Sequence, residues 1–287
     1  MPEPATGSRP DETGARVAIE RGRMMQMLLR VLSRFSANRP PDALQEISNA
    51  IGMKLVLLPA GEFLMGSPHD DPDARMDEKP QHLVQISQPF FLSVTLATQA
   101  QYHQVMGDNP SRFQGDPQRP VERVSWEDAV EFCHRLSEQE GQTYRLPTEA
   151  QWEYACRADT TTRYSFGDDP AELGDHAWYG ANSSATTHPV ARKKPNPWGF
   201  FDLLGNVAEW CADGYSVDAY ARSSEKDPTG PDSAALRVLR GGCWRDHQTD
   251  RFRSAARLAL PPTFRFDYRG FRVVRTLEPE TSPDADR

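Results

Sequence analysis

The chain has 287 residues, of which 38% are apolar, so it is long enough to bury a substantial core. Its formal net charge of −8 argues against nucleic acid as a general partner, because the phosphates would meet an acidic field. No apolar run reaches about 18 residues, and we therefore predict no transmembrane segment. The 24 prolines and 19 glycines favour a loop-rich fold.

The beginning of the chain is rich in Pro, Gly and charge, and its apolar run at 24–29 is short and followed by Arg30. This pattern is not that of a secretory signal peptide, so we expect a cytoplasmic protein. The four cysteines are far apart and form no Cys-x-x-Cys pair. In a reducing compartment free thiols are expected at Cys133, Cys156, Cys211 and Cys243.

Composition divides the chain into four parts. Both ends have the Pro, Gly, Ser and charge bias of disordered tails, and the stretch between them suits one large domain better than two. The predicted parts are a tail at 1–15, an amphipathic helix and linker at 16–48, a domain at 49–276 and a tail at 277–287.

The predicted N-terminal helix has one apolar face. Met24, Leu28, Val31 and Phe35 recur at helical spacing, and arginines occupy the opposite face. Such a helix could dock on the domain, on a partner protein or on an acidic membrane surface, through contacts at 16–36.

Three helix starts are predicted from capping boxes. In a capping box, a small hydroxyl residue lies three positions before a residue whose side chain reaches back to it. The pairs are Thr98 with Gln101, Ser125 with Asp128, and Thr148 with Gln151. After the second pair, Val130, Cys133 and Leu136 are predicted to line one face of the helix. Gly141, which tolerates positive φ, is predicted to end it.

Short apolar runs predict strands. Residues 53–58 and 62–65, separated by Pro-Ala-Gly, predict a β-hairpin, and residues 236–239 and 271–274 predict inner strands. Helices and strands in separate blocks indicate an α+β class.

Residues 198–210 read Trp-Gly-Phe-Phe-Asp-Leu-Leu-Gly-Asn-Val-Ala-Glu-Trp. Asp202 and Glu209 offer carboxylate oxygens, and Gly205 and Val207 can present carbonyl oxygens. An oxygen-only shell of this kind suits Ca²⁺. The alternative is a Gly-Asn turn between two buried aromatic residues.

Four further motifs, at 52–67, 144–155, 237–244 and 270–274, occur in an order that closely resembles the sulfatase-modifying, formylglycine-generating-enzyme family. The resemblance runs from about 52 to 275 and implies an α+β, C-type-lectin-like, loop-rich fold with few helices. It also implies calcium ligands at Asp202, Gly205, Val207 and Glu209. The second calcium site of the oxidases needs an Asp-Gly-Phe-type loop, whereas Asn182 is followed here by Ser-Ser-Ala.

The chain departs from the oxidases of this family in its cysteines. Those enzymes hold Cu(I) with two cysteines downstream of Gly-Gly-Ser-Trp, and here no cysteine lies between Trp244 and Gly270. Because Cu(I) selects thiolate ligands, we expect no copper. Cys243 is a single thiol, interpreted either as a buried small residue or as a reactive nucleophile.

The stretch 244–268 mixes arginine, aromatic and small polar residues, which interfaces favour. In relatives diversified by retroelements, the variable residues lie in this stretch. The candidate ligand-binding residues are Trp244, Arg245, Asp246, His247, Thr249, Asp250, Thr263, Phe264, Phe266 and Tyr268. The alternative is that Phe264, Phe266 and Phe271 belong to the core. Arg257, Arg265 and Arg272 are then predicted to pair with the acidic surplus.

Two functions remain open from these observations. The first is a calcium-stabilised, non-copper pseudoenzyme that presents its C-terminal face to a protein or small-molecule ligand. The second is an oxidase or other modifying enzyme that acts through Cys243 or through an unassigned pocket. Fold resemblance alone does not decide between them.

Overall fold

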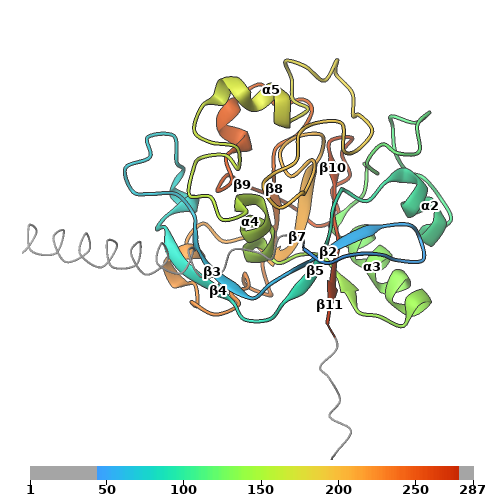
Figure 1. Cartoon of the computed structure of the whole chain (residues 1–287), viewed down its shortest axis with the longest axis horizontal. Coiled ribbons are helices and arrows are strands. Elements are labelled where there is room, and N and C mark those ends of the chain that lie inside the picture. Colours follow the sequence, from blue (N-terminus) through green and yellow to red (C-terminus); the bar gives the residue numbers. More distant parts are fainter. Residues whose placement is uncertain (1–43, 278–287) are drawn as a thin grey trace, which may run out of the picture. The chain divides into compact units, whose positions relative to one another are not determined.

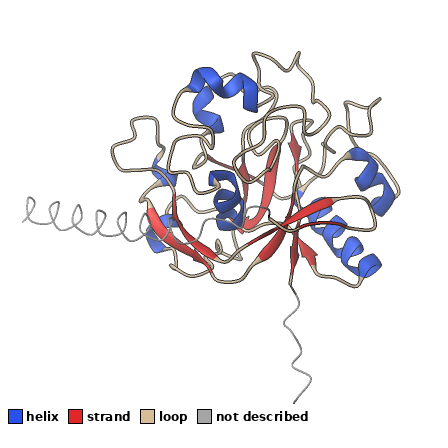
Figure 2. Cartoon of the chain, viewed as in Figure 1, coloured by secondary structure: helices blue, strands red, loops and turns tan. Residues whose placement is uncertain are grey.

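A computed structural model describes residues 44–277 of the chain. The predicted tail at 1–15, the helix at 16–36 and nearly all of the C-terminal tail fall outside these residues. Within the described part, no helix is long and apolar enough to cross a membrane. Figure 2 shows that much of this part is loop, with helices and strands distributed among the loops.

The largest sheet joins strands that are distant in sequence (Figure 1). Its order is β1 (Glu46–Ser48), β2 (Lys54–Leu58), β5 (Phe90–Ser93), β11 (Val274–Thr276) and β6 (Tyr144–Arg145). All neighbours are antiparallel. The first strand therefore begins before the predicted domain start at 49.

A second sheet has the order β10 (Arg269–Gly270), β7 (Ala208–Gly214), β8 (Arg237–Arg240) and β9 (Arg257–Leu260). The pair β10–β7 is parallel and the others are antiparallel. The predicted inner strand at 236–239 is confirmed as β8. The predicted strand at 271–274 is wrong in its bounds, because the chain passes there from β10 of this sheet to β11 of the first.

The predicted hairpin is also wrong. Both of its strands exist, but β2 pairs with β1 and β5, whereas β3 (Gly61–Met65) pairs with β4 (His82–Ile86) in a separate two-stranded sheet. The Pro-Ala-Gly connection leads the chain from one sheet to another.

The described helices are α2 (Gln99–Met106), α3 (Trp126–Glu140), α4 (Glu149–Arg157) and α5 (Leu173–His176), with short 3₁₀ turns η1 (Met76–Glu78), η2 (Pro170–Glu172), η3 (Tyr220–Arg222) and η4 (Thr249–Phe252). All three predicted capping boxes are confirmed, at the starts of α2, α3 and α4. Gly141 ends α3 with φ 62°, as predicted.

The predicted face of α3 needs one correction. Val130 is 38% exposed, whereas Ala129, Phe132, Cys133 and Leu136 are buried. The buried stripe thus begins one residue earlier and follows the i, i+3, i+4, i+7 pattern of an amphipathic helix.

The core contains two main groups of buried residues. One lies around α4, whose nine residues are all buried, and Figure 1 shows this helix between β3–β4 and β7–β8. The other group joins α2 and α3 to the five-stranded sheet. Because α4 is enclosed, its charged side chains must find partners inside the protein.

Candidate functional site

The turn from Asp202 to Glu209 needs an unusual backbone. Asp202, Gly205 and Asn206 have φ of 55°, 85° and 59°, in the left-handed region that favours glycine and asparagine. A Cβ on Gly205 would lie 2.5 Å from the carbonyl oxygen of Trp178. Glycine is therefore required here both for φ and for space.

Two buried carboxylates flank this turn. Asp202 accepts hydrogen bonds from the backbone N–H of Ala191 (2.8 Å) and from the amide of Asn206 (3.3 Å). Glu209, fully buried, accepts from Nε and Nη2 of Arg272 at 2.6 and 3.1 Å. Burial raises the pKa of both carboxyl groups, because it penalises the charged form.

The donor set is compatible with a hard cation. The charge of Asp202 adds to the effect of burial in raising the pKa of Glu209, and the charge of Arg272 lowers the pKa of both carboxyl groups. In residues 44–277 no group of three or more His, Cys, Asp or Glu side chains forms a metal cluster. A calcium site here would combine the two carboxylates with the carbonyl oxygens of Gly205 and Val207, and Glu209 would share its oxygens with Arg272.

The turn is also connected to the predicted C-terminal face. The N–H of Trp244 donates to the carbonyl of Asn206 (2.9 Å), and the N–H of Ala208 donates to the carbonyl of Tyr268 (3.1 Å). Val207, Trp244 and Tyr268 pack in one small apolar cluster. The turn therefore positions both ends of the stretch 244–268.

Three aromatic side chains of this face form a row. Phe266 stacks on Tyr268 with ring centroids 5.0 Å apart, and Phe264 contacts Phe266 edge-on at 5.7 Å. Phe264 is 43% exposed, and the other two are half-buried. The core alternative holds for Phe271, which is fully buried against Phe132, but not for Phe264.

Arginine and tryptophan side chains extend this row. The guanidinium of Arg245 lies 4.6 Å from the ring centroid of Tyr268, a cation–π distance. Trp244 is buried, donates from Nε1 to the carbonyl of Asp267 (2.8 Å) and packs edge-on against Phe113. The structure thus brings residues 244–245 together with residues 264–268.

The remaining predicted residues of the face lie in three places. His247 is exposed, and a Cβ on Gly180 would come within 2.6 Å of its ring. Thr249 and Asp250 open η4, where the carbonyl of Thr249 accepts from the Tyr164 hydroxyl (3.2 Å). Thr263 is exposed beside Phe264.

The side chain of Cys243 is buried and hydrogen-bonded to Asp246. Its S–H donates to Oδ2 of Asp246 (3.1 Å), which also accepts from the Cys243 N–H (3.0 Å). Burial and the neighbouring carboxylate raise the pKa of this thiol to about 12. The side chain is therefore protonated at neutral pH, opposite to the thiolate that nucleophilic chemistry needs.

The thiol environment leads to a prediction. All four cysteines are unpaired and buried, so Ellman's reagent should react slowly with the folded protein and with four thiols after unfolding in guanidinium. Fast reaction of one thiol in the folded protein, lost on Cys243→Ser, would contradict this description of Cys243.

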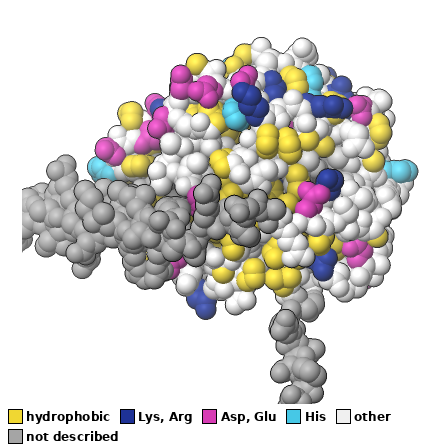
Figure 3. Space-filling model, viewed as in Figure 1, with side chains coloured by type: hydrophobic (Ala, Val, Ile, Leu, Met, Phe, Trp, Pro, Cys, Tyr) yellow, Lys and Arg dark blue, Asp and Glu magenta, His cyan; other side chains and the backbone are white. Residues whose placement is uncertain are grey.

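The three arginines predicted to pair with acids do so. Arg257 binds Glu149 through Nε (2.7 Å) and Nη2 (2.8 Å), and Arg265 binds Asp128 through two hydrogen bonds of 2.7 Å. Arg272 binds Glu209, as described above. On the face shown in Figure 3, acidic and basic side chains also lie beside one another.

Sequence reasoning missed the buried ion network around α4. Glu153 and Arg240 are fully buried and form an ion pair, and Arg240 also reaches Glu149 (3.2 Å). Burial raises the pKa of Glu153, but Arg157 and Arg240 outweigh it and the pKa lies below its usual value. The available signal was the i, i+4 spacing of Glu149 and Glu153, which places two carboxylates on one helix face.

Residues 43–277 match the family described as the sulfatase-modifying factor enzyme 1-like domain. The chain belongs to this family. A curated relative, the formylglycine-generating enzyme of Streptomyces coelicolor, is 36% identical over 182 residues, which are 58% of this chain and 56% of the enzyme. The chain covers between 38% and 56% of the length of the first three curated relatives.

Two solved structures resemble the chain over most of its length. Treponema denticola variable protein 1 is 30% identical with a TM-score of 0.74, covering 81% of this chain and 99% of its own. PvdO from Pseudomonas aeruginosa is 30% identical with a TM-score of 0.75, covering 83% and 100%. The α+β, formylglycine-generating-enzyme-like fold is therefore confirmed.

Proposed function

We propose that this member of the family is a calcium-stabilised binding module that presents the face at 244–268 to a protein or small-molecule ligand. The observation that carries the proposal is the aromatic row of Phe264, Phe266 and Tyr268, with Arg245 over its end. Aromatic and arginine side chains dominate binding energy at interfaces. The likeness to Treponema denticola variable protein 1, whose name describes it as variable, supports 244–268 as a diversified stretch.

The cysteine chemistry favours binding over oxidation. No cysteine lies between Trp244 and Gly270, so the thiolate pair that Cu(I) would require is missing. The remaining thiol, that of Cys243, is buried and protonated. Binding that depends on the aromatic row should therefore be unchanged by Cys243→Ser. Four unpaired cysteines also support a reducing compartment, and we place the protein in the cytoplasm.

Calcium has a structural role in this proposal. The turn carries two buried carboxylates, and it hydrogen-bonds to Trp244 and Tyr268 at the two ends of the face. A cation held by Asp202, Gly205, Val207 and Glu209 would fix the turn and so order the face. Ordering before binding lowers the entropy cost of association.

The proposal is tested by selecting ligands. The purified protein with calcium is used to enrich peptides from a random display library, and one enriched peptide is titrated against variants. Phe264→Ala and Tyr268→Ala should each weaken binding about tenfold or more, as expected for interface anchors. Val217→Ala, a matched change at a 57% exposed apolar residue outside the face, should leave it unchanged.

Two results would contradict the proposal. One is an enriched peptide whose affinity is the same for the Phe264 and Tyr268 variants as for the parent protein. The other is aldehyde formation when the copper-supplemented protein is incubated with a sulfatase-type cysteine peptide. That product would favour the alternative oxidase, with Cys243 as the first residue to substitute.

A further inference from the structure

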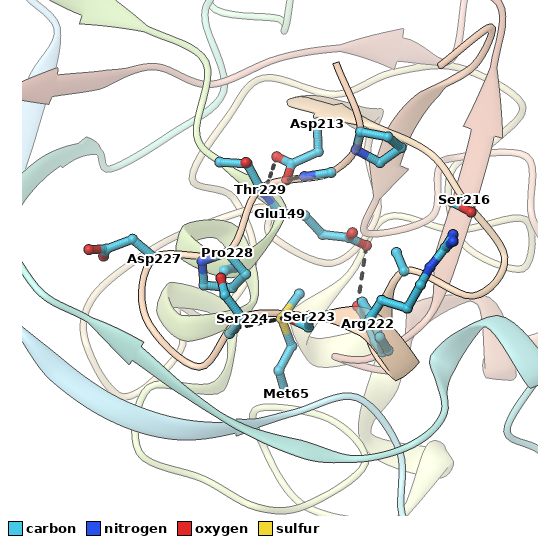
Figure 4. A pocket seen from close by; sticks show the side chains of 15 residues that line it. Met65, Glu149, Asp213, Ser216, Arg222, Ser223, Ser224, Asp227, Pro228 and Thr229 are labelled. Atoms are coloured by element: carbon cyan, nitrogen blue, oxygen red, sulfur yellow. Dashed lines mark hydrogen bonds between the residues drawn. The ribbon is translucent and has the colours of Figure 1, made fainter. Parts of the chain in front are cut away.

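A cavity of about 430 Å³ lies among β3, the start of α4, the end of β7 and the loop at 216–231. Figure 4 shows Asp213 and Glu149 on one side of this hollow and Met65 on the other. The volume is within the range of about 300–1,000 Å³ that small-molecule sites occupy. None of the residues of the face at 244–268 lines it.

Asp213 is the unusual group in its wall. This carboxylate is 7% exposed, and its oxygens accept backbone N–H groups of Glu149 (2.7 Å) and Gly230 (2.8 Å). Among residues 44–277, no Lys, Arg or His nitrogen lies within ion-pair distance of it. A carboxylate offers about four lone-pair positions, so each oxygen retains capacity for a further donor.

The neighbouring carboxylate differs in this respect. Glu149 is held by Arg257 through two hydrogen bonds and also accepts from Arg240. Its charge is therefore already compensated, whereas that of Asp213 faces the cavity with backbone donors alone. A buried carboxylate without a direct ion-pair partner is costly, and a cation in the cavity would relieve that cost.

The rest of the lining mixes hydroxyl, apolar and charged side chains. The charged ones are Asp227 and Arg222, and the guanidinium of Arg222 is paired with Asp218. Hydroxyl groups come from Ser216, Ser223, Ser224 and Thr229, and Met65 adds an apolar surface. Hydroxyls accept as well as donate hydrogen bonds, so they complement an ammonium group near Asp213. The thioether suits a short alkyl chain.

We propose that this cavity binds a small organic cation that carries a primary ammonium group, with the ammonium donating to Asp213 and the alkyl part lying toward Met65. The site is separate from the C-terminal face and does not depend on the function proposed for that face. Success or failure of either test leaves the other unaffected.

The proposal also carries a pH dependence. Glu149, Arg257 and Arg145 are the charged groups that act on Asp213, and Arg222 and Asp227 also line the cavity. Burial, and then the charge of Glu149, raises the pKa of Asp213 to about 6. Because the ammonium binds the ionised carboxylate, affinity should be full above this pKa and fall as the pH drops through it.

Calorimetric titration with defined probes tests the site. Near neutral pH, putrescine and n-butylamine should bind, and 1-butanol and butyrate should not. Asp213→Asn should weaken amine binding about tenfold or more, because it removes the charge from a hydrogen-bonded ion pair. Asp232→Asn, a matched change at an exposed carboxylate outside the cavity, should have no effect.

A second variant protects the test against misfolding. Ser224 is exposed at the cavity, so Ser224→Trp fills the space while Asp213 keeps its backbone partners. We expect this variant to unfold at the parent midpoint and to lose amine binding. Equal binding of butylamine and butanol, or unchanged amine affinity in both variants, would overturn the proposal.

Discussion

Replacing Arg240 with Met is expected to lower the free energy of unfolding by about 3 kcal/mol, because it removes one of the two arginine partners of the buried Glu153 and leaves that charge with Arg157 alone. Arg240 and Glu153 are both fully buried, and Glu149 loses one of its two arginine partners. Arg240 also donates to the carbonyls of Ser254 (2.7 Å) and Ala255 (3.1 Å). Urea denaturation followed by circular dichroism measures the change.

The matched control is Arg135→Met on α3. Arg135 and Glu131 form an exposed i, i+4 pair, with side chains 44% and 47% exposed. Exposed ion pairs contribute about 0–1 kcal/mol to stability, so the free energy of unfolding of this variant should be close to that of the parent. Similar losses in the two variants would show that the buried network around α4 does not have the stabilising role assigned to it.

Removing calcium is expected to lower stability by about 4 kcal/mol when the parent is measured with free calcium about 1,000-fold above its Kd. The reason is that calcium should bind the folded turn and not the unfolded chain. Thermal unfolding in calcium and in EGTA measures the difference. Removing calcium with EGTA should also weaken the binding of the selected peptide, because the turn holds Trp244 and Tyr268 in place.

Asp202→Asn separates a site-specific effect from a general one. It removes one buried carboxylate of the proposed site while keeping its size and one acceptor oxygen. The variant should show the same unfolding midpoint in calcium and in EGTA, whereas Asp218→Asn, at an exposed carboxylate before η3, should keep the calcium response of the parent. An identical midpoint for the parent in calcium and EGTA would contradict the calcium proposal.

Local features of the fold were predictable from the chain. The capping boxes at Thr98, Ser125 and Thr148 were correct because all the atoms involved lie within four residues. The predicted helix end at Gly141 was correct for the same reason. The prediction for Val130 was wrong because several three- and four-residue spacings fit one apolar helix face, and packing against Tyr102 and Phe271 selected Phe132 instead.

Long-range pairing was not predictable in the same way. The hairpin failed because β3 takes β4 as its partner and β2 takes β1 and β5, and no local signal distinguishes these choices. The ion pairs of Arg240 with Glu153 and Glu149 join residues 87 and 91 positions apart. Such partners are brought together only by the enclosure of α4 between two sheets.

The candidate site was predictable only in part. The acids that pair with arginines were expected as a group, but their identities depended on tertiary structure, as with Glu209 and Arg272. The aromatic row was ambiguous because Phe264, Phe266 and Phe271 have similar sequence surroundings. Only the fold separates Phe271, against α3, from Phe264 at the surface.

The most direct test of the account is where a selected ligand touches the protein. Benzoylphenylalanine is placed at position 264 or, as the matched exposed control, at position 217, and each protein is irradiated with the selected peptide. We predict cross-linking from position 264 that unlabelled peptide competes away, and none from position 217. Equal cross-linking from the two positions, or none from 264 at saturating peptide, would contradict the claim that this face binds the ligand.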